Sequence, residues 1–341
     1  MIRPTLSALL AAPLLCALSP LADDVSFHPS DGSDVTRRYS VDLDFELGDL
    51  SITADGQDIT EMIPTDQMNG TAKLAMKVTE SFVRSAEGKP LELIRSFEEM
   101  SGEAGPEGNK EAIEDFDKLQ GKRVRFVWNE DDGDYDVSYH ESEGDEEDLE
   151  GLVPDMDLRA LLPGKAVSAG DTWSVDARQL SSVLLFGNEP KLGEDEMDQV
   201  LQSSIVPQLE ALLDQVKTTC EYQGERVVDG HKVGAVAVTL HGEGSLDLSQ
   251  LILEAVQMQA GGENQIDLDV STAKLNIAFD SKGELLWDLE QGHLRAFDMT
   301  GDADLSIEIS ASADVGGESH SGDFDAEATL TGTWKVAPAE G

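Results

Sequence analysis

The sequence predicts an α+β protein dominated by β-structure: a large twisted antiparallel sheet, half-barrel or barrel-like, with a few helices packed on its apolar face. Three observations predict this class. Long stretches alternate strictly between apolar and polar residues, Asp-Gly and Pro-Gly turn signals separate such stretches, and only a few segments show apolar residues at helical spacing. A period of two with acidic residues on one side is typical of antiparallel strands that have one solvated face.

The first 22 residues have the layout of a secretory signal peptide. One positive charge precedes an apolar run from Leu6 to Leu21, which Pro13 and Pro20 interrupt. The run is too short and too interrupted to span a bilayer comfortably. We expect cleavage near Ala22, a flexible leader over residues 23–36, and an exported protein, periplasmic or extracellular, with no stable membrane span.

The charge balance limits the partners that the protein can have. Sixty-nine acidic residues against 24 basic ones give a formal net charge of −45. Nucleic acids and anionic membrane surfaces both attract basic faces, so neither is an expected partner. Two readings of the acidity stay open: adaptation to a salty exterior, or binding of divalent cations or basic partners.

Residues 37–150 are predicted to form an N-terminal β-meander. Apolar residues alternate with Asp and Glu from Val41 to Leu47, and Ala72–Phe82 and Leu91–Phe97 are the next strands. Asp132-Gly133 is typical of a hairpin turn between two further strands, because Asp-Gly adopts positive φ readily. Lys110–Gln120 has apolar residues on one helical face and is predicted as a short helix.

Residues 151–216 are predicted to be a linker that contains a tryptophan and helices over Asp176–Phe186 and Glu194–Val216, where Pro207 kinks or splits the second helix. Residues 217–337 form a C-terminal β-meander with one helix, Ser249–Ala260. In it, Gln265–Phe279, Gly283–Glu290 and His293–Met299 are predicted as separate strands. A duplicated layout and one continuous domain over 37–337 both fit, and we favour one continuous sheet.

The last two strands carry the candidate ligand-binding residues. Alternation continues without a slip through Ala303–Ala313 and Phe324–Val336, and many of the inward positions are alanine or glycine. Small inward residues on long strands permit tight curvature or leave room for helices or a ligand. The candidate residues for an apolar site are Trp173, Leu305, Ile307, Leu330 and Trp334.

Motifs for catalysis or metal binding are missing from the sequence. It contains no His-Glu-x-x-His, no Gly-x-Ser-x-Gly and no phosphate-binding glycine loop. The turn Asn129–Asp136 has the composition of a calcium loop but not its spacing, and His231 and His241 are more typical of an exposed hairpin than of a metal site. We therefore predict no catalytic residue, no metal site, no cofactor and no enzymatic activity.

The stretch Leu161–Val175 links the two β-rich halves. It contains Leu162-Pro163, then Val167, then Gly170-Asp171-Thr172-Trp173. This order resembles a motif of secreted bacterial proteins of uncharacterised function. The resemblance implies export but identifies no catalytic residues. The overall layout is also similar to periplasmic lipoprotein-carrier and lipid-binding half-barrels, although no motif is shared with them.

These observations together favour an exported, non-enzymatic protein that binds a lipid or another hydrophobic ligand on the apolar face of its sheet. The alternative is a salt-adapted acidic surface or interaction protein that binds cations or basic partners.

Overall fold

The computed structural model describes most of the chain, namely residues 25–63, 65, 68–106, 109–113, 116–178, 201–259, 267–315 and 318–339. The expected signal peptide and the expected helix Asp176–Phe186 lie almost wholly outside this set. None of the helices described is long and apolar enough to cross a membrane.

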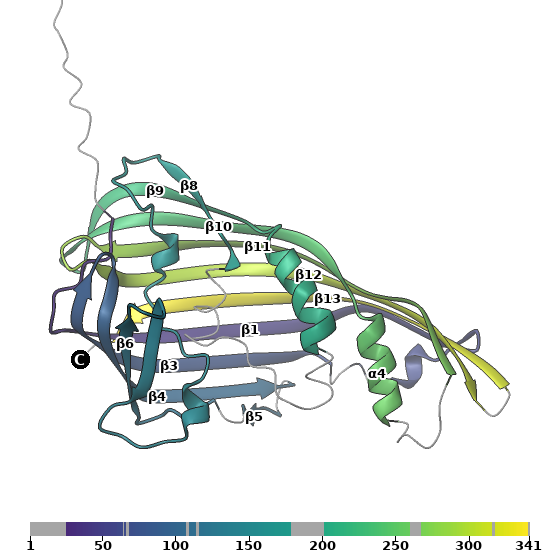
Figure 1. Ribbon diagram of the computed structural model, residues 1–341. Helices are drawn as coiled ribbons and strands as arrows, with labels where there is room; N and C mark the ends of the chain where they lie inside the picture. The colour runs from purple at the N-terminus through teal and green to yellow at the C-terminus, as the bar shows by residue number, and fades with distance from the viewer. Residues whose placement is uncertain are drawn as a thin grey trace, which may run out of the picture.

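The strands belong to one large antiparallel sheet, in which the long strands run side by side (Figure 1). Its order is β7-β6-β4-β3-β1-β13-β12-β11-β10-β9-β8, with β2 beside β1 and β5 beside β4. The strands are β1 (Ser33–Ala54), β2 (Gln57–Asp58), β3 (Gly70–Ala86), β4 (Lys89–Gly105), β5 (Glu111–Ala112), β6 (Arg123–Asn129), β7 (Asp134–Tyr139), β8 (Thr172–Val175), β9 (Lys217–Val228), β10 (His231–Asp247), β11 (Asp267–Asp288), β12 (His293–Val315) and β13 (Glu318–Pro338).

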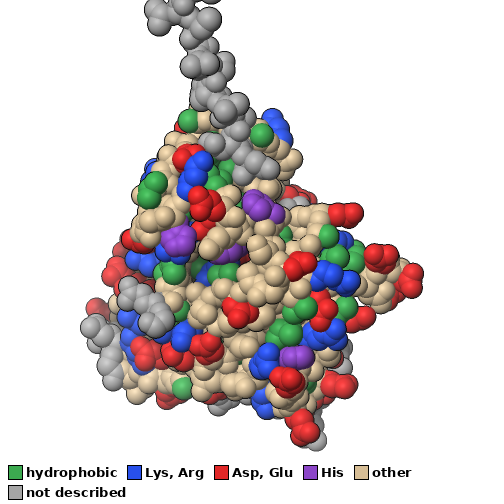
Figure 2. Space-filling view, turned by 90° about the vertical axis from the view of Figure 1, so that its left-hand side faces the viewer, with side chains coloured by type: hydrophobic (Ala, Val, Ile, Leu, Met, Phe, Trp, Pro, Cys, Tyr) green, Lys and Arg blue, Asp and Glu red, His purple; other side chains and the backbone are tan. Residues whose placement is uncertain are grey.

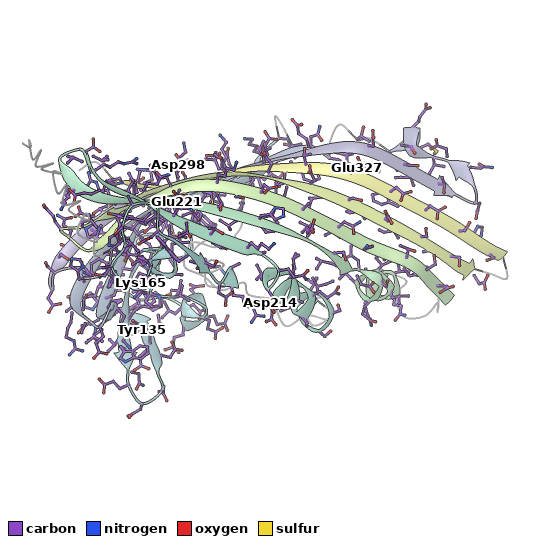
Figure 3. All side chains as sticks on the ribbon, turned by 90° about the horizontal axis from the view of Figure 1, so that it is seen from above. Tyr135, Lys165, Asp214, Glu221, Asp298 and Glu327 are labelled. Atoms are coloured by element: carbon purple, nitrogen blue, oxygen red, sulfur yellow. The ribbon has the colours of Figure 1, made fainter. Side chains whose placement is uncertain are left out.

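The two β-rich halves meet where β1 pairs with β13, so the first and last long strands form the middle of the sheet. The predicted fold class is therefore confirmed, including the preference for one continuous sheet. The sheet is open: its order ends at β7 on one side and at β8 on the other. Seen from above, it curves into an arch (Figure 3).

Tight turns join several neighbouring strands, as the sequence predicts. Asp229 and Gly230 have φ values of 50° and 82°, and Glu87 and Gly88 have 54° and 75°. Two consecutive residues with positive φ make the turn whose twist matches that of antiparallel strands. A glycine at the second position removes the side-chain clash that this backbone region imposes on other residues.

Two α-helices occur in the described part of the chain. Helix α3 (Val206–Leu213) follows a π-helical turn (Leu201–Ile205), and Pro207 lies in its first turn. Helix α4 (Ser249–Gln259) matches the prediction for Ser249–Ala260 as far as it is described. Short 3₁₀ turns occur at Thr60–Met62, Glu146–Leu149 and Arg159–Leu161.

Two predictions about elements are wrong. The helix expected over Lys110–Gln120 is replaced at Glu111–Ala112 by strand β5, which pairs with β4, and the main-chain nitrogen of Ile113 donates to Gly102 O. The strand breaks expected near Gly283 and Gly301 are absent, because both glycines continue in register within β11 and β12. A Cβ on Gly283 would lie 2.7 Å from Asp298 O, so close strand approach, rather than a turn, requires glycine there.

The main core lies at one end of the long strands, which we call the packed end; it holds the first residues of β1 and the last residues of β13. The crossover segment 146–167, between β7 and β8, and the N-terminal segment 25–28 lie over the inner face there. Figure 2 shows the outside of this end, where acidic and basic side chains are interspersed. Core side chains include Phe27, Tyr39, Phe82, Phe97, Phe126, Leu152, Met156, Leu158, Leu161, Tyr222 and Trp287.

Buried charges attach the crossover segment to the sheet. Glu80 lies between two arginines: its Oε2 is 3.0 Å from Arg37 Nη1 and its Oε1 is 2.8 Å from Arg95 Nη2. Arg37 also forms a 2.6 Å ion pair with Asp157. Arg95 donates to the carbonyl oxygens of Val153 and Pro154, at 2.9 Å each. Two buried cations are thus balanced by two buried carboxylates, which limits the cost of removing them from water.

We predict that Glu80→Gln destabilises the protein by about 3 kcal/mol or more, because it leaves two buried guanidinium groups facing one carboxylate. Urea unfolding measures the change. Glu99→Gln is the matched control, because Glu99 pairs with Arg38 at the surface, 3.1 Å away, and such pairs contribute at most about 1 kcal/mol. Equal losses from the two substitutions would contradict the assigned role of Glu80.

Candidate ligand-binding face

The inner face of the sheet is apolar along nearly the full length of the long strands. Because side chains alternate between faces, the cross-strand register defines rows of inner residues that run across the sheet. Successive rows are Val41–Trp334–Met299–Gly283–Val238, Leu43–Gly332–Gly301–Ser281–Leu240, Phe45–Leu330–Ala303–Phe279–Gly242, Leu47–Ala328–Leu305–Ile277–Gly244 and Leu50–Ala326–Ile307–Leu275–Leu246.

The outer face has the opposite character. Asp42, Thr333, Thr300 and Lys282 form one outer row, and Asp44, Thr331, Asp302 and Asp280 form the next. In Figure 3 the outer residues Asp298 and Glu327 lie on the convex side of the arch, whereas Asp214, after α3, lies on the concave side. The alternation that predicted the strands therefore separates an acidic convex face from an apolar concave one.

The described helices cover one flank of the apolar face. Helix α3 contacts β10 and α4 contacts β11. Gly242 and Gly244 on β10 allow this close approach, because a Cβ on Gly244 would collide with Leu212 of α3 and one on Gly242 would lie 3.0 Å from Val216. Towards β12, β13 and β1 the inner side chains remain half-buried, among them Leu305 and Ile307. We call this half-covered region, from the Leu43 row to the Leu50 row, the inner trough.

A cavity of about 380 Å³ lies where the inner trough meets the packed end. Gly332 and Gly301 contribute only backbone to its wall, between Leu43 on one side and Leu240 on the other. A Cβ on Gly332 would lie 3.1 Å from Leu43 Cδ2. Gly332 therefore leaves space that a larger side chain would occupy, whereas the side chain of Ser281 takes the position of a Cβ on Gly301. The other apolar lining residues are Val41, Phe279, Met299, Ala303, Leu330 and Trp334.

A second hollow of about 720 Å³ continues the inner trough away from the packed end. Gln215, just after α3, borders it, together with Ile277, Leu305 and Ala328. Neither hollow has a lysine, an arginine or a histidine in its lining. The lining of the larger hollow also includes Glu243, Asp304 and Glu327, so the combined lining offers apolar surface and carboxylates but no cation to pair with an anionic headgroup.

The candidate residues fall into two groups. Leu330 and Trp334 line the smaller cavity, and Leu305 lines the larger hollow; Ile307 is in the next inner row. Trp173 lies elsewhere: it pairs with Cys220 across β8 and β9, packs against the core, and its indole nitrogen donates to Leu161 O at 3.1 Å. Trp173 therefore anchors the Leu161–Val175 loop to the packed end and does not line the trough.

Sequence reasoning missed the residues that shape the cavity. Gly332 was placed in an alternating strand and Gly301 between two predicted strands, and neither was predicted to line a site. A signal was present in Thr331-Gly332-Thr333-Trp334, where glycine replaces an inner apolar residue without interrupting the alternation. Gly301 has the same inner position in the neighbouring strand, which only the cross-strand register could reveal.

The histidines and acidic turns make structural contacts. His231 Nδ1 is 2.9 Å from Asp288 Oδ2, and His241 Nδ1 is 2.9 Å from Asp280 Oδ1, so the two histidines have different partners. Asn129 in the turn of the β6–β7 hairpin donates to Asp132 at 2.7 Å. Within the described part of the chain, no group of three or more His, Cys, Asp or Glu residues is arranged to hold a metal ion.

Cys220 and His293 are titratable groups that burial perturbs. Cys220 is a buried free thiol, and burial raises its pKa to about 12, so it is not a nucleophile at neutral pH. Burial, reinforced by the positive charge of Arg37, lowers the pKa of His293 to about 4. Asp288 opposes this change and Arg295 adds to it. Both groups belong to the packed end and lie outside the trough.

Comparisons with known proteins leave the function open. No protein family model and no curated protein is similar to this chain. Among solved structures, one described as lipid–protein interactions in lipovitellin is 10% identical with a TM-score of 0.29; the match covers 92% of this chain and 26% of that one. The outer membrane protein OprG from Pseudomonas aeruginosa is 9% identical with a TM-score of 0.18, covering 93% and 100%. Similarities this low carry no functional argument.

We predict that His293 contributes a loss of stability as the pH is lowered from about 6.5 to 5. The unfolded chain binds a proton near pH 6.5, whereas folded His293 stays neutral down to about pH 4, so this residue costs about 2 kcal/mol by pH 5. His293→Gln should remove this part of the pH dependence of urea unfolding, and His241→Gln, at an exposed position, should not. An unchanged slope in His293→Gln would refute the assignment.

We also predict that Leu305→Asp leaves the protein folded, with a loss of about 1 kcal/mol, because this side chain faces the half-covered trough. Leu285→Asp in the packed end should prevent folding, because Leu285 is fully buried and a carboxylate there would have no partner. Circular dichroism and thermal melting distinguish the two variants. An unfolded Leu305→Asp protein would mean that the trough is part of a closed core.

Proposed function

We propose that this protein binds a hydrophobic ligand, such as a lipid, in the inner trough of its sheet. The observation that carries the proposal is the continuous apolar face over five long strands, of which the described helices cover one flank, together with the glycine-walled cavity beside it. Contiguous exposed apolar surface beyond a few hundred Å² is unusual in soluble proteins and is typical of binding sites.

The trough favours a long, uncharged apolar group. From the Leu43 row to the Leu50 row the trough extends over six residue steps of β13, from Gly332 to Ala326, or about 20 Å at the rise of an antiparallel strand. The linings contain no basic side chain, and the net charge of −45 repels anions. Ligands with neutral or cationic headgroups are therefore favoured over anionic amphiphiles.

Export and the lack of catalysis are parts of the same proposal. The segment over residues 1–22 supports placement in the periplasm or outside the cell, where hydrophobic molecules need a carrier or a store to cross water. A binding function requires no catalytic residue and no cofactor. Leu305, Ile307, Leu330 and Trp334 are the ligand-contacting residues proposed from the original candidates, and Gly301 and Gly332 shape the cavity.

The acidic convex face supports a second candidate, binding of cations or basic partners. Its specific support is the outer row in which Asp44, Asp302 and Asp280 are separated only by Thr331. This candidate uses the opposite face of the sheet. The two functions can therefore be tested separately, by changing inner or outer residues of the same strand.

The decisive experiment combines native mass spectrometry with one pair of variants in β13. We expect protein purified without detergent from the exported fraction to carry an added mass of several hundred daltons, which organic extraction removes. Gly332→Val should abolish this mass and weaken binding of the neutral probe N-phenyl-1-naphthylamine at least about tenfold, because valine fills the cavity. Valine suits a strand, and its nearest neighbour is the flexible end of Leu43.

Thr331→Val is the matched control, because it places the same side chain one residue away on the exposed outer face. It should leave both the bound mass and the probe affinity unchanged. A protein that carries no extractable mass and binds no apolar probe would refute the carrier function. Equal binding by Gly332→Val and the wild type would refute the location of the site.

A further inference from the structure

Strand β7 forms a free edge of the sheet. It pairs with β6 on one side, from Asn129↔Asp134 to Val124↔Tyr139, and none of the described strands pairs with its other side. An unpaired edge presents a row of main-chain donors and acceptors that can accept a further strand. The main-chain groups that face outwards, and the residues that surround them, determine what can bind at this edge.

The phase of the β6–β7 ladder identifies the outward groups. The main-chain nitrogen of His140 donates to Arg123 O at 2.8 Å, so alternate residues, including Ser138 and Asp136, face β6. The main-chain N–H and C=O groups of Val137 and Tyr139 therefore point away from β6. Those of Tyr135 do too, but its N–H is already bonded to Asp134 Oδ1 at 2.8 Å.

A groove of about 760 Å³ runs along this edge. All of β7 forms one wall, and Glu146 with the segment 149–154 forms the other. Contacts to other parts of the molecule hold the second wall in place: Tyr139 donates its hydroxyl to Asp145 O at 2.9 Å, and Arg95 donates to Val153 O and Pro154 O. The groove is thus built between two anchored segments.

The groove combines an apolar side with an acidic one. Tyr135, Val137 and Tyr139 are partly buried and pack on the core, and Leu149 of the second wall is buried. Asp134, Asp136 and Glu146 supply carboxylates, and no basic residue occurs in the lining. The surrounding run from Glu141 to Glu150 adds further negative charge. A strand placed here would meet apolar side chains on one face and carboxylates on the other.

We propose that the β7 edge groove binds an extended peptide segment in which lysine or arginine alternates with apolar residues, added as a further strand beside β7. The main-chain groups of Val137 and Tyr139 supply backbone hydrogen bonds. The acidic side selects basic side chains, and Leu149 lies on the side that takes the apolar ones. This mode of recognition, strand addition with side-chain selection, needs only about five residues of partner. It uses a different part of the sheet from the inner trough and does not rest on ligand binding there.

The test uses two labelled octapeptides on the full-length mature protein, one alternating Lys and Val and one alternating Glu and Val. Fluorescence anisotropy should show binding of the Lys–Val peptide only, and the affinity should fall as salt is raised. Hydrogen exchange should show slower exchange of the Val137 and Tyr139 amides in the complex, which electrostatic attraction alone would not produce.

Two charge reversals supply the matched variants. Asp136→Lys changes an exposed residue of the groove, and Asp304→Lys changes an exposed residue on the outer face of β12; both alter the net charge equally. We expect Asp136→Lys to weaken Lys–Val binding about fivefold or more and Asp304→Lys to have little effect. Equal effects of the two variants, equal binding of the Glu–Val peptide, or unchanged exchange at Val137 and Tyr139 would each overturn the proposal.

Discussion

The alternation of side chains along strands of about 20 residues is the constraint on which the rest of this structure depends. Strands β1, β11, β12 and β13 are each 21 to 23 residues long, and every second residue is committed to the inner face. Since neighbouring long strands keep their register with few bulges, one apolar surface extends across the sheet. Acidic residues at the alternate positions keep the convex face solvated, so the inner face is the one whose apolar side chains favour burial.

The chain covers this surface unevenly, and buried charges determine where the cover is strongest. Glu80 connects Arg37 and Arg95, which between them contact Asp157 and the carbonyl groups of residues 153 and 154. The crossover segment is therefore fixed over the packed end. Further along the strands, α3 and α4 are the described elements that pack on the inner face, on the flank of β10 and β11. The inner trough is the part of the apolar face that lies between the crossover segment and these two helices.

Much of the fold could be predicted because alternation and turn chemistry are local signals. The dipeptide Asp229-Gly230 indicates a turn by itself. The alternating runs that begin at Val41 and Ala303 likewise indicate strands without reference to the rest of the chain. The helix expected over Lys110–Gln120 was wrong at Glu111–Ala112, because pairing with β4 outweighs the weak helical periodicity of a short segment. Strand breaks were predicted close to Gly283 and Gly301, although contacts with the adjacent strand require glycine at both positions. Such contacts depend on the register between neighbouring strands, which cannot be predicted from the sequence of one strand alone.

The same distinction separates the parts of the candidate site. Period two places Leu305, Ile307, Leu330 and Trp334 on one face, and the structure does bring these four to the inner face. Trp173 was grouped with them because it is large and apolar, but its position depends on a loop whose partner, Leu161 O, is part of the same segment. The cavity arises only when Gly332 and Gly301 become neighbours in different strands. Its existence is therefore a property of the assembled sheet.

A sheet with one partly covered apolar face and unpaired edges leaves two kinds of group without partners: apolar side chains on the face and main-chain donors and acceptors at the edge. This protein shows both. The inner trough lacks apolar contacts, which a hydrophobic ligand can supply without hydrogen bonds. The β7 edge lacks main-chain partners, which only an extended backbone can supply. Because the trough lies on the face of the central strands and the groove lies at one border of the sheet, neither occupant blocks the other. The proposed ligand and the proposed peptide would therefore not compete for the same surface.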